Sequence, residues 1–284
     1  MTHKISPRQT ATAVVGGILA YCICSLGFGM TVSSWLNHHN YNVSKNPARL
    51  INIPAGDFLM GSADGEKVSF QNEKPQHKVY LNEYWIDVHK VSNAMFAACV
   101  DDDGCSAPGS NYSGWRSNIY ENPDYRDHPV TNVTWQQARD YCIWAGRDLP
   151  TEAQWEKAAR GLDGRIYPWG DTIDCSLANY SECKIKDTTP VNRYKAGASA
   201  YGVLDMSGNV WEWVLDWYDP SYYGISPSIN PSGPITGTLK VLRGGSWLNG
   251  ANYTRTAYRF TAKPDQPSTY YGFRCANQTM SNNP

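Results

Sequence analysis

Three short stretches near the C-terminus place glycine beside tryptophan, phenylalanine or arginine, and they constrain the fold more than any other feature. They read GNVWEW at residues 208–213, RGGSW at 243–247 and GFRCA at 272–276. Glycine permits positive φ and close backbone approach, whereas large aromatic rings bury much apolar surface. With 11 Trp and 19 Tyr in 284 residues, the chain is expected to hold much irregular backbone in place with aromatic side chains.

The N-terminal segment has the composition of a membrane-spanning helix. Residues 10–36 carry no charge, and about 20 apolar residues suffice to cross a hydrocarbon core. Lys4 and Arg8 precede them, so the positive-inside rule leaves residues 1–9 in the cytoplasm. We expect a single-pass anchor in the inner (cytoplasmic) membrane, a linker at 37–49 and a periplasmic domain at 50–284. A cleaved signal peptide is the alternative, because its basic start and apolar middle look the same.

Charge and histidine placement argue against two classes of site. The net charge of -1 offers no excess of cations to neutralise phosphates, so a nucleic-acid partner is not expected. The six histidines are scattered, and no pair has the helical spacing of metal ligands. A histidine-bound iron centre is therefore not expected either.

Six of the eight cysteines follow the apolar segment, an even number that suits three bridges in an oxidising compartment. Cys99 and Cys105 flank an acidic turn, and Cys175 and Cys183 are eight residues apart, so local pairing of each couple is plausible. That leaves Cys142 and Cys275. A metal site is the competing interpretation, but no Cys-x-x-Cys pair supports it.

The middle of the chain predicts several strands and three helices. Alternating or short apolar runs indicate strands at 50–53, 58–61, 77–81 and 84–88, the last two as a pair around Asn82 and Glu83. Ser92 is expected to cap a helix to Val100. Capping boxes predict two more helices, which begin after Thr134 and Thr151, with the second ending near Arg160 and Gly161. The proline-rich residues 219–238 look like a surface loop of the kind that shapes binding faces.

Together with IPAG at 53–56, LPTEAQWE at 149–156 and YPWGD at 167–171, the glycine stretches resemble the formylglycine-generating enzyme or sulfatase-modifying-factor family. The resemblance covers roughly residues 50 to 277, with the motifs in family order. It implies an α+β, C-type-lectin-like domain with much irregular structure. It also implies a bridge between Cys142 and Cys275, which match positions bridged in the family.

In that family, oxidase chemistry depends on two cysteines that follow the Gly-Gly-Ser turn, and here residues 248–255 read LNGANYTR. Copper and formylglycine-generating activity are therefore not expected, because the soft thiolate ligands for Cu(I) are missing. No histidine beyond His128 could activate another nucleophile. The resemblance implies a cleft around five residues, which are Trp213, Ser246, Asn249, Arg255 and Arg259.

The resemblance also implies structural Ca²⁺. Asn209, Glu212 and the Val210 carbonyl could supply hard oxygen ligands. For a second site, Asn179 and the Tyr180 carbonyl match half the ligand set, with Asp187 as a candidate acid. The alternative is that Asn209 holds a turn and that Glu212 pairs with Arg243 or Arg274.

Two functions fit these features. The first is a membrane-anchored binding or scaffolding module, or an accessory subunit of a membrane complex, whose partner is a membrane protein or an exported protein or peptide. The second is an oxidative modifying enzyme for exported peptides or proteins that works without the cysteine pair. The fold alone cannot decide between them.

Overall fold

The structure, a computed structural model, describes residues 48–277. The expected anchor at 10–36 lies outside these residues. Between residues 48 and 277, no helix is both long and apolar enough to cross a membrane. The helices and longer strands are β1 (Leu50–Ile53), β2 (Gly56–Met60), β3 (His77–Leu81), β4 (Tyr84–Asp87), α2 (Asn93–Asp101), α3 (Trp135–Trp144), α4 (Glu152–Arg160), β5 (Trp211–Trp217), β6 (Lys240–Arg243), β7 (Phe260–Ala262) and β8 (Tyr271–Phe273), and they are followed by the short β9 (Ala276–Asn277).

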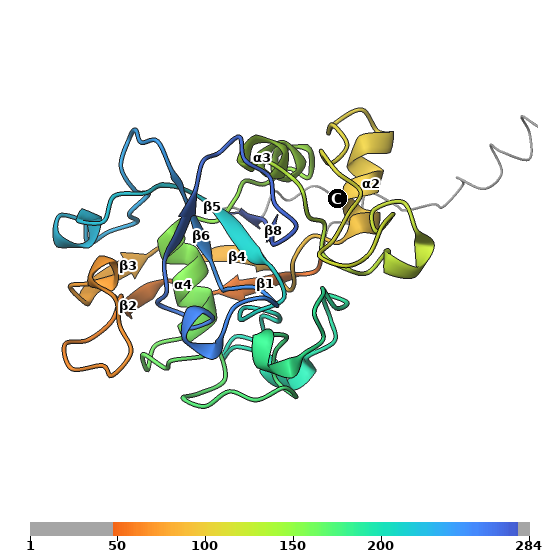
Figure 1. The fold of residues 1–284 in the computed structure, drawn as a ribbon. Helices are drawn as coiled ribbons and strands as arrows, with labels where there is room; N and C mark the ends of the chain where they lie inside the picture. The colour runs from red at the N-terminus through yellow and green to blue at the C-terminus, as the bar shows by residue number, and fades with distance from the viewer. Residues whose placement is uncertain (1–47, 278–284) are drawn as a thin grey trace, which may run out of the picture. The chain divides into compact units, whose positions relative to one another are not determined.

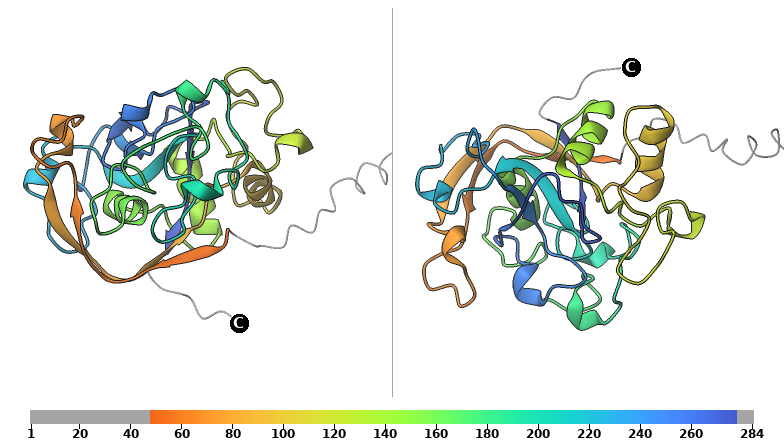
Figure 2. Two further views of the ribbon diagram at one scale, coloured as in Figure 1. Left: turned by 90° about the horizontal axis from the view of Figure 1, so that it is seen from below. Right: turned by 45° about the horizontal axis from the view of Figure 1, so that its top comes forward.

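The four N-terminal strands form two antiparallel pairs that follow one another along a long curved ribbon in Figure 2. β1 pairs with β4, and β2 pairs with β3. The hairpin expected between residues 77–81 and 84–88 does not form. Instead, pairing stops between Ile53 and Gly56, where Pro54 has no N–H to donate. The two halves therefore belong to separate sheets, with β9 completing the first.

A four-stranded sheet in the order β7-β6-β5-β8 forms the second half of the domain. β5 runs antiparallel to β6 and parallel to β8, so the GNVWEW and GFRCA stretches lie side by side. α4 packs against β2, β3, β5 and β6 (Figure 1). All nine of its residues are buried, which places a charged helix in the centre of the domain.

The predicted helix starts are confirmed. Thr134 and Thr151 each accept a backbone N–H three residues on and form complete capping boxes. Ser92 caps α2 in the same way through the Met95 N–H. α4 ends at Gly161, whose φ of 70° is a conformation that glycine adopts without strain.

The glycines of the C-terminal motifs allow close backbone contact. Gly208 has φ of 77°, and a Cβ at this position would lie 2.2 Å from the Asn179 carbonyl oxygen. Its N–H donates to the Gly244 carbonyl at 2.7 Å. Gly245, with φ of 76°, would bring a Cβ within 2.6 Å of Thr254. The GNVWEW and RGGSW stretches are therefore joined backbone to backbone, with no space for side chains at these two glycines.

Candidate functional site

The Gly-Gly-Ser turn brings Ser246 and Asn249 together. The Ser246 hydroxyl donates to Asn249 Oδ1 at 2.5 Å, and the Ser246 N–H donates to the same oxygen at 3.1 Å. Thr254 is buried, and its hydroxyl donates to the Ala251 carbonyl at 2.9 Å. The side chains of Ser246, Asn249 and Thr254 thus hydrogen-bond within the segment that carries them.

The other residues expected in the cleft are buried. Trp213 is fully buried in the aromatic core, and its indole N–H donates to the Val133 carbonyl. Both terminal nitrogens of Arg255 donate to the Glu73 carboxylate, at 3.0 and 2.7 Å. The Nε and Nη2 atoms of Arg259 donate to the Glu152 carboxylate at 2.7 and 2.9 Å. The two arginines therefore hold carboxylates of the N-terminal half of the domain, and a role at a cleft stays a prediction for all three residues.

Glu152 and Glu156 of α4 form a buried ionic cluster with arginines from β6 and the segment beyond it. Arg243, itself fully buried, donates to Glu152 at 3.1 Å and to Glu156 at 2.6 Å. Burial by itself would raise the pKa of Glu152, but Arg259 and Arg243 hold it below its usual value. The i, i+4 spacing of Glu152, Glu156 and Arg160 was the available sequence signal, but it does not reveal partners about 90 residues away.

Asp216 stands next to this cluster and should make stability depend on pH. Its Oδ2 accepts the Glu152 N–H at 2.8 Å, while burial and then the Glu152 charge raise the pKa of Asp216 to about 7. The folded state therefore keeps a proton that the unfolded state loses near pH 4. The contribution of the Asp216 carboxyl group to the free energy of unfolding is therefore fully present below about pH 4 and is lost as the pH rises to about 7.

We expect Asp216→Asn to remove this loss, since an amide oxygen can still accept the Glu152 N–H. Urea unfolding of both proteins at pH 5 and pH 8 checks it. The stability of the variant relative to the wild type should be greater at pH 8 than at pH 5 by roughly 2–3 kcal/mol, because the pKa of about 7 lies two units above pH 5. An equal difference at both pH values would show that Asp216 ionises normally in the folded domain.

The GNVWEW turn is closed by hydrogen bonds and ion pairs. Asn209, with φ of 65°, accepts the Thr189 N–H at 3.0 Å and donates to the Thr189 carbonyl and to Asp205. Val210, the source of the expected carbonyl ligand, is fully buried. Glu212 is fully buried and receives Arg274 on both oxygens, at 2.6 and 3.0 Å. These partners occupy the side-chain oxygens of Asn209 and Glu212 that were expected to bind Ca²⁺, so these two side chains do not fit that ion here.

Lys90, which the sequence reasoning missed, completes this cluster. Its ammonium lies 3.0 Å from Glu212 Oε1 and 3.5 Å from Asp205 Oδ2, and it donates to the Asp205 carbonyl. Burial raises the pKa of Asp205 to about 6, although Lys90 opposes the rise. The only sequence signal was a lone lysine between a strand and a helix cap.

The second set of expected calcium ligands is partly open. Asn179 is fully buried, and its Nδ2 donates to the Asp187 carbonyl at 2.8 Å. Its Oδ1 has no hydrogen-bond partner. The Tyr180 carbonyl accepts the Cys183 N–H, and Asp187 Oδ2 accepts the Ser113 hydroxyl at 2.6 Å. Within residues 48–277, no three His, Cys, Asp or Glu side chains group as a metal site, so calcium at this set stays a prediction.

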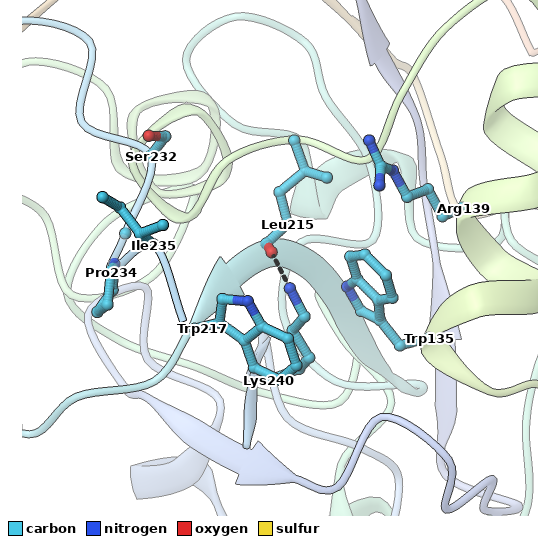
Figure 3. Close-up of a pocket in the computed structure, with 9 residues that line it drawn as sticks. Trp135, Arg139, Leu215, Trp217, Ser232, Pro234, Ile235 and Lys240 are labelled. Carbon is cyan, nitrogen blue, oxygen red and sulfur yellow. Dashed lines mark hydrogen bonds between the residues drawn. The ribbon is translucent and has the colours of Figure 1, made fainter. Parts of the chain in front are cut away.

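An open hollow of about 440 Å³ lies where the 219–238 loop meets α3, β5 and β6 (Figure 3). The Lys240 ammonium lies between two indole rings, 3.9 Å from the Trp135 centroid and 3.8 Å from that of Trp217. It donates to the Leu215 carbonyl at 2.6 Å. Burial lowers the pKa of Lys240 to about 8. Ile235, on the loop side, is 96% exposed. An exposed apolar side chain therefore lies beside the two indole rings that contact the Lys240 ammonium.

Three disulfides close the described domain. Cys99–Cys105 and Cys175–Cys183 confirm the local pairs, and Cys142–Cys275 confirms the pair implied by the resemblance. The last one joins α3 to the residue before β9. Such bridges indicate an extracellular or periplasmic domain, since cytosolic thiols are kept reduced.

Comparison with known proteins agrees with this architecture. The sequence profile of the sulfatase-modifying factor enzyme 1-like domain matches residues 38–279. The chain belongs to this family. The expected α+β fold of C-type-lectin type, with much irregular structure, is thereby confirmed.

The relatives that this chain resembles include proteins named as enzymes and a protein named as inactive. It is 37% identical to a formylglycine-generating enzyme of Streptomyces coelicolor, over 80% of this chain and 88% of that protein. It is 29% identical to the inactive C-alpha-formylglycine-generating enzyme 2 of Mus musculus, over 82% and 87%. Among solved structures, PvdO from Pseudomonas aeruginosa superposes with a TM-score of 0.71 at 26% identity, over 82% and 95%. Family membership thus includes proteins named as enzymes and one named as inactive.

Proposed function

We propose that this chain is a membrane-anchored periplasmic binding or scaffolding module, an accessory subunit of a membrane protein complex, without copper-dependent formylglycine-generating activity. Residues 10–36 would serve as the anchor. The domain at residues 50–284 would present its surface to the partner.

The observation that carries the proposal is the state of the cysteines. The residues after the Gly-Gly-Ser turn offer Asn249 and Thr254 where thiols would be needed, and all six cysteines of the described domain are paired in disulfides. Without a thiolate, the domain has neither a soft ligand for Cu(I) nor a group to capture a substrate cysteine. The inactive mouse relative is precedent for a member without the activity.

The hollow beside the 219–238 loop is the surface we assign to the partner protein. Trp217 lines it and Ile235 stands exposed beside it, and aromatic and apolar side chains of this kind dominate the energetics of protein interfaces. An apolar side chain of the partner, seated against the indoles, would bury Ile235.

The test is purification of the full chain from its own membranes in mild detergent. We expect a stoichiometric membrane protein to accompany it, with capture reduced by Ile235→Asp. The matched control is Leu162→Asp, which alters an exposed leucine (64%) elsewhere on the surface. Recovery of the chain alone, or equal capture by both variants, would contradict the proposal.

The same preparation tests the activity. We expect no aldehyde on a thiol-bearing peptide supplied with Cu(I) and dioxygen. A cysteine-independent enzyme is the second candidate. It is favoured by the short hydrogen bond from the Ser246 hydroxyl to Asn249, a side chain that is only half-buried. That candidate requires oxygen uptake with an exported peptide that Ser246→Ala abolishes. Aldehyde formation with stoichiometric copper would overturn the first proposal.

A further inference from the structure

The hollow beside the 219–238 loop has a positively charged wall. Of the nine residues that line it, Arg139 of α3 and Lys240 of β6 are cationic and none is acidic. The whole chain has a net charge of -1, so this wall differs in sign from the chain as a whole. The rest of the lining is apolar or aromatic except for Ser232. Such a surface suits a ligand that carries a negative charge next to an apolar group.

Lys240 has no ion-pair partner in the part of the chain that the structure describes. It is 3% exposed, and its ammonium contacts the Leu215 carbonyl and the indole faces of Trp135 and Trp217, which are all neutral. These groups replace some of the lost hydration, but they do not balance the charge. An anion in the hollow would balance it.

The acidic residues near the hollow do not fill this role. Asp148 accepts the Nε and Nη2 atoms of Arg139, both at 3.0 Å. Asp216 accepts the Glu152 N–H, and its raised pKa of about 7 leaves it partly protonated at neutral pH. Their charges raise the pKa of Lys240 by less than burial and Arg139 lower it. With Asp216 protonated, the two cations face only Asp148, which leaves one positive charge in excess. A single carboxylate would neutralise it.

Arg139 leaves a donor at the edge of the hollow. Its side chain is 40% exposed, and its guanidinium extends from α3 over the Trp135 ring toward the hollow (Figure 3). The Nη1 atom is not used in the pair with Asp148. A carboxylate that entered here would accept from Nη1 and lie in the field of the Lys240 ammonium.

We propose that the hollow binds an acidic side chain of the partner protein, with its carboxylate between Arg139 and Lys240 and a neighbouring apolar side chain against Trp217. This inference rests on the proposed function, because it names the group that the partner places in the surface already assigned to it. The positive charge selects the acidic side chain, and the indole and the exposed Ile235 select the residue beside it. A phosphate dianion would exceed the one charge that the wall leaves uncompensated.

The experiment uses the full chain in mild detergent with three tripeptide probes. Acetyl-Leu-Glu-Leu-amide and acetyl-Leu-Gln-Leu-amide differ by one charge, and acetyl-Leu-Gln-Leu with a free C-terminus moves that charge to the main chain. Saturation-transfer NMR gives the Kd of each peptide. We expect the Glu peptide to bind about 10-fold more tightly than the Gln peptide, since hydrogen bonds to charged groups are the stronger ones. The peptide with the free C-terminus should bind like the Gln peptide.

Two variants test the two cations separately. Lys240→Met keeps an apolar side chain between the indoles, and Arg139→Gln keeps a polar one at a partly exposed position. Each should reduce the preference for the Glu peptide at least about threefold. The matched control is Lys78→Met, which removes an exposed lysine, 69% accessible, and should leave the preference unchanged.

The inference is overturned if the Glu peptide does not bind, if the Glu and Gln peptides bind equally, or if the free C-terminus binds as tightly as the Glu side chain. An unchanged preference in both variants also overturns it. A chain that captures its partner through Ile235 but does not distinguish the peptides keeps the proposed function and loses this inference. A chain recovered alone that still prefers the Glu peptide loses the proposed function and keeps the charge selectivity of the hollow.

Discussion

Replacing Arg243 by methionine is expected to lower the free energy of unfolding by about 3–5 kcal/mol, because it leaves two buried carboxylates short of a partner. Arg243 contacts Glu152 and Glu156 and also donates to the Thr256 carbonyl at 2.6 Å. Methionine restores most of the volume but none of these bonds. The loss is measured by urea denaturation at pH 7.

The matched control is Lys78→Met, which breaks the exposed pair with Asp57. That pair has side chains 69% and 49% accessible, and surface pairs contribute only about 0–1 kcal/mol. If both variants lost the same stability, the buried cluster would not support the fold in the way its geometry indicates.

The second large effect is expected from the disulfide between Cys142 and Cys275. Changing both residues to alanine should cost about 3–5 kcal/mol, since the bridge closes a loop with a sequence separation of 133 residues. The alanine pair at Cys99 and Cys105, separated by 6 residues, should cost roughly 2–3 kcal/mol less, because loop-closure entropy grows with loop length. Thermal and urea unfolding under oxidising conditions compare the two variants. A larger loss from the short bridge would rule out loop entropy as the main contribution.

The buried arginines also change how catalysis has to be tested. Arg259→Ala would remove a partner of Glu152 and its bond to the Asn72 carbonyl, so lost activity in that variant would report lost structure. Ser246→Ala changes only the contacts within the turn. It is therefore the cleaner variant for deciding whether the turn takes part in any reaction.

Features encoded by neighbouring residues could be predicted from the sequence. The capping boxes at Thr134 and Thr151, the helix end at Gly161 and the short disulfides all depend on residues within a turn or two of one another. The Cys142–Cys275 bridge is long-range and came only from the family resemblance. Local patterns sufficed wherever the partner was nearby.

Contacts across the chain could not be predicted. Nothing in the sequence pairs Glu73 with Arg255 or Lys90 with Glu212, since charge type alone does not select one partner among 26 acidic residues. The expected hairpin at residues 77–88 was wrong for the same reason, because β3 and β4 each pair with an earlier strand. The hollow beside the 219–238 loop likewise depends on how that loop packs against Asp216 and Trp217 of β5.

We expect the two halves of the domain to fold together, because the carboxylates of the buried helix α4 need arginines from the C-terminal half. Glu152 and Glu156 meet Arg243 and Arg259 only after a further 87 to 107 residues. A chain that emerges N-terminus first therefore lacks the counter-charges needed to bury this helix until Arg243 and Arg259 have been synthesised. The nascent polypeptide should stay open and threadable through a translocation pore, and a copy truncated before Arg243 should be degraded rather than accumulate.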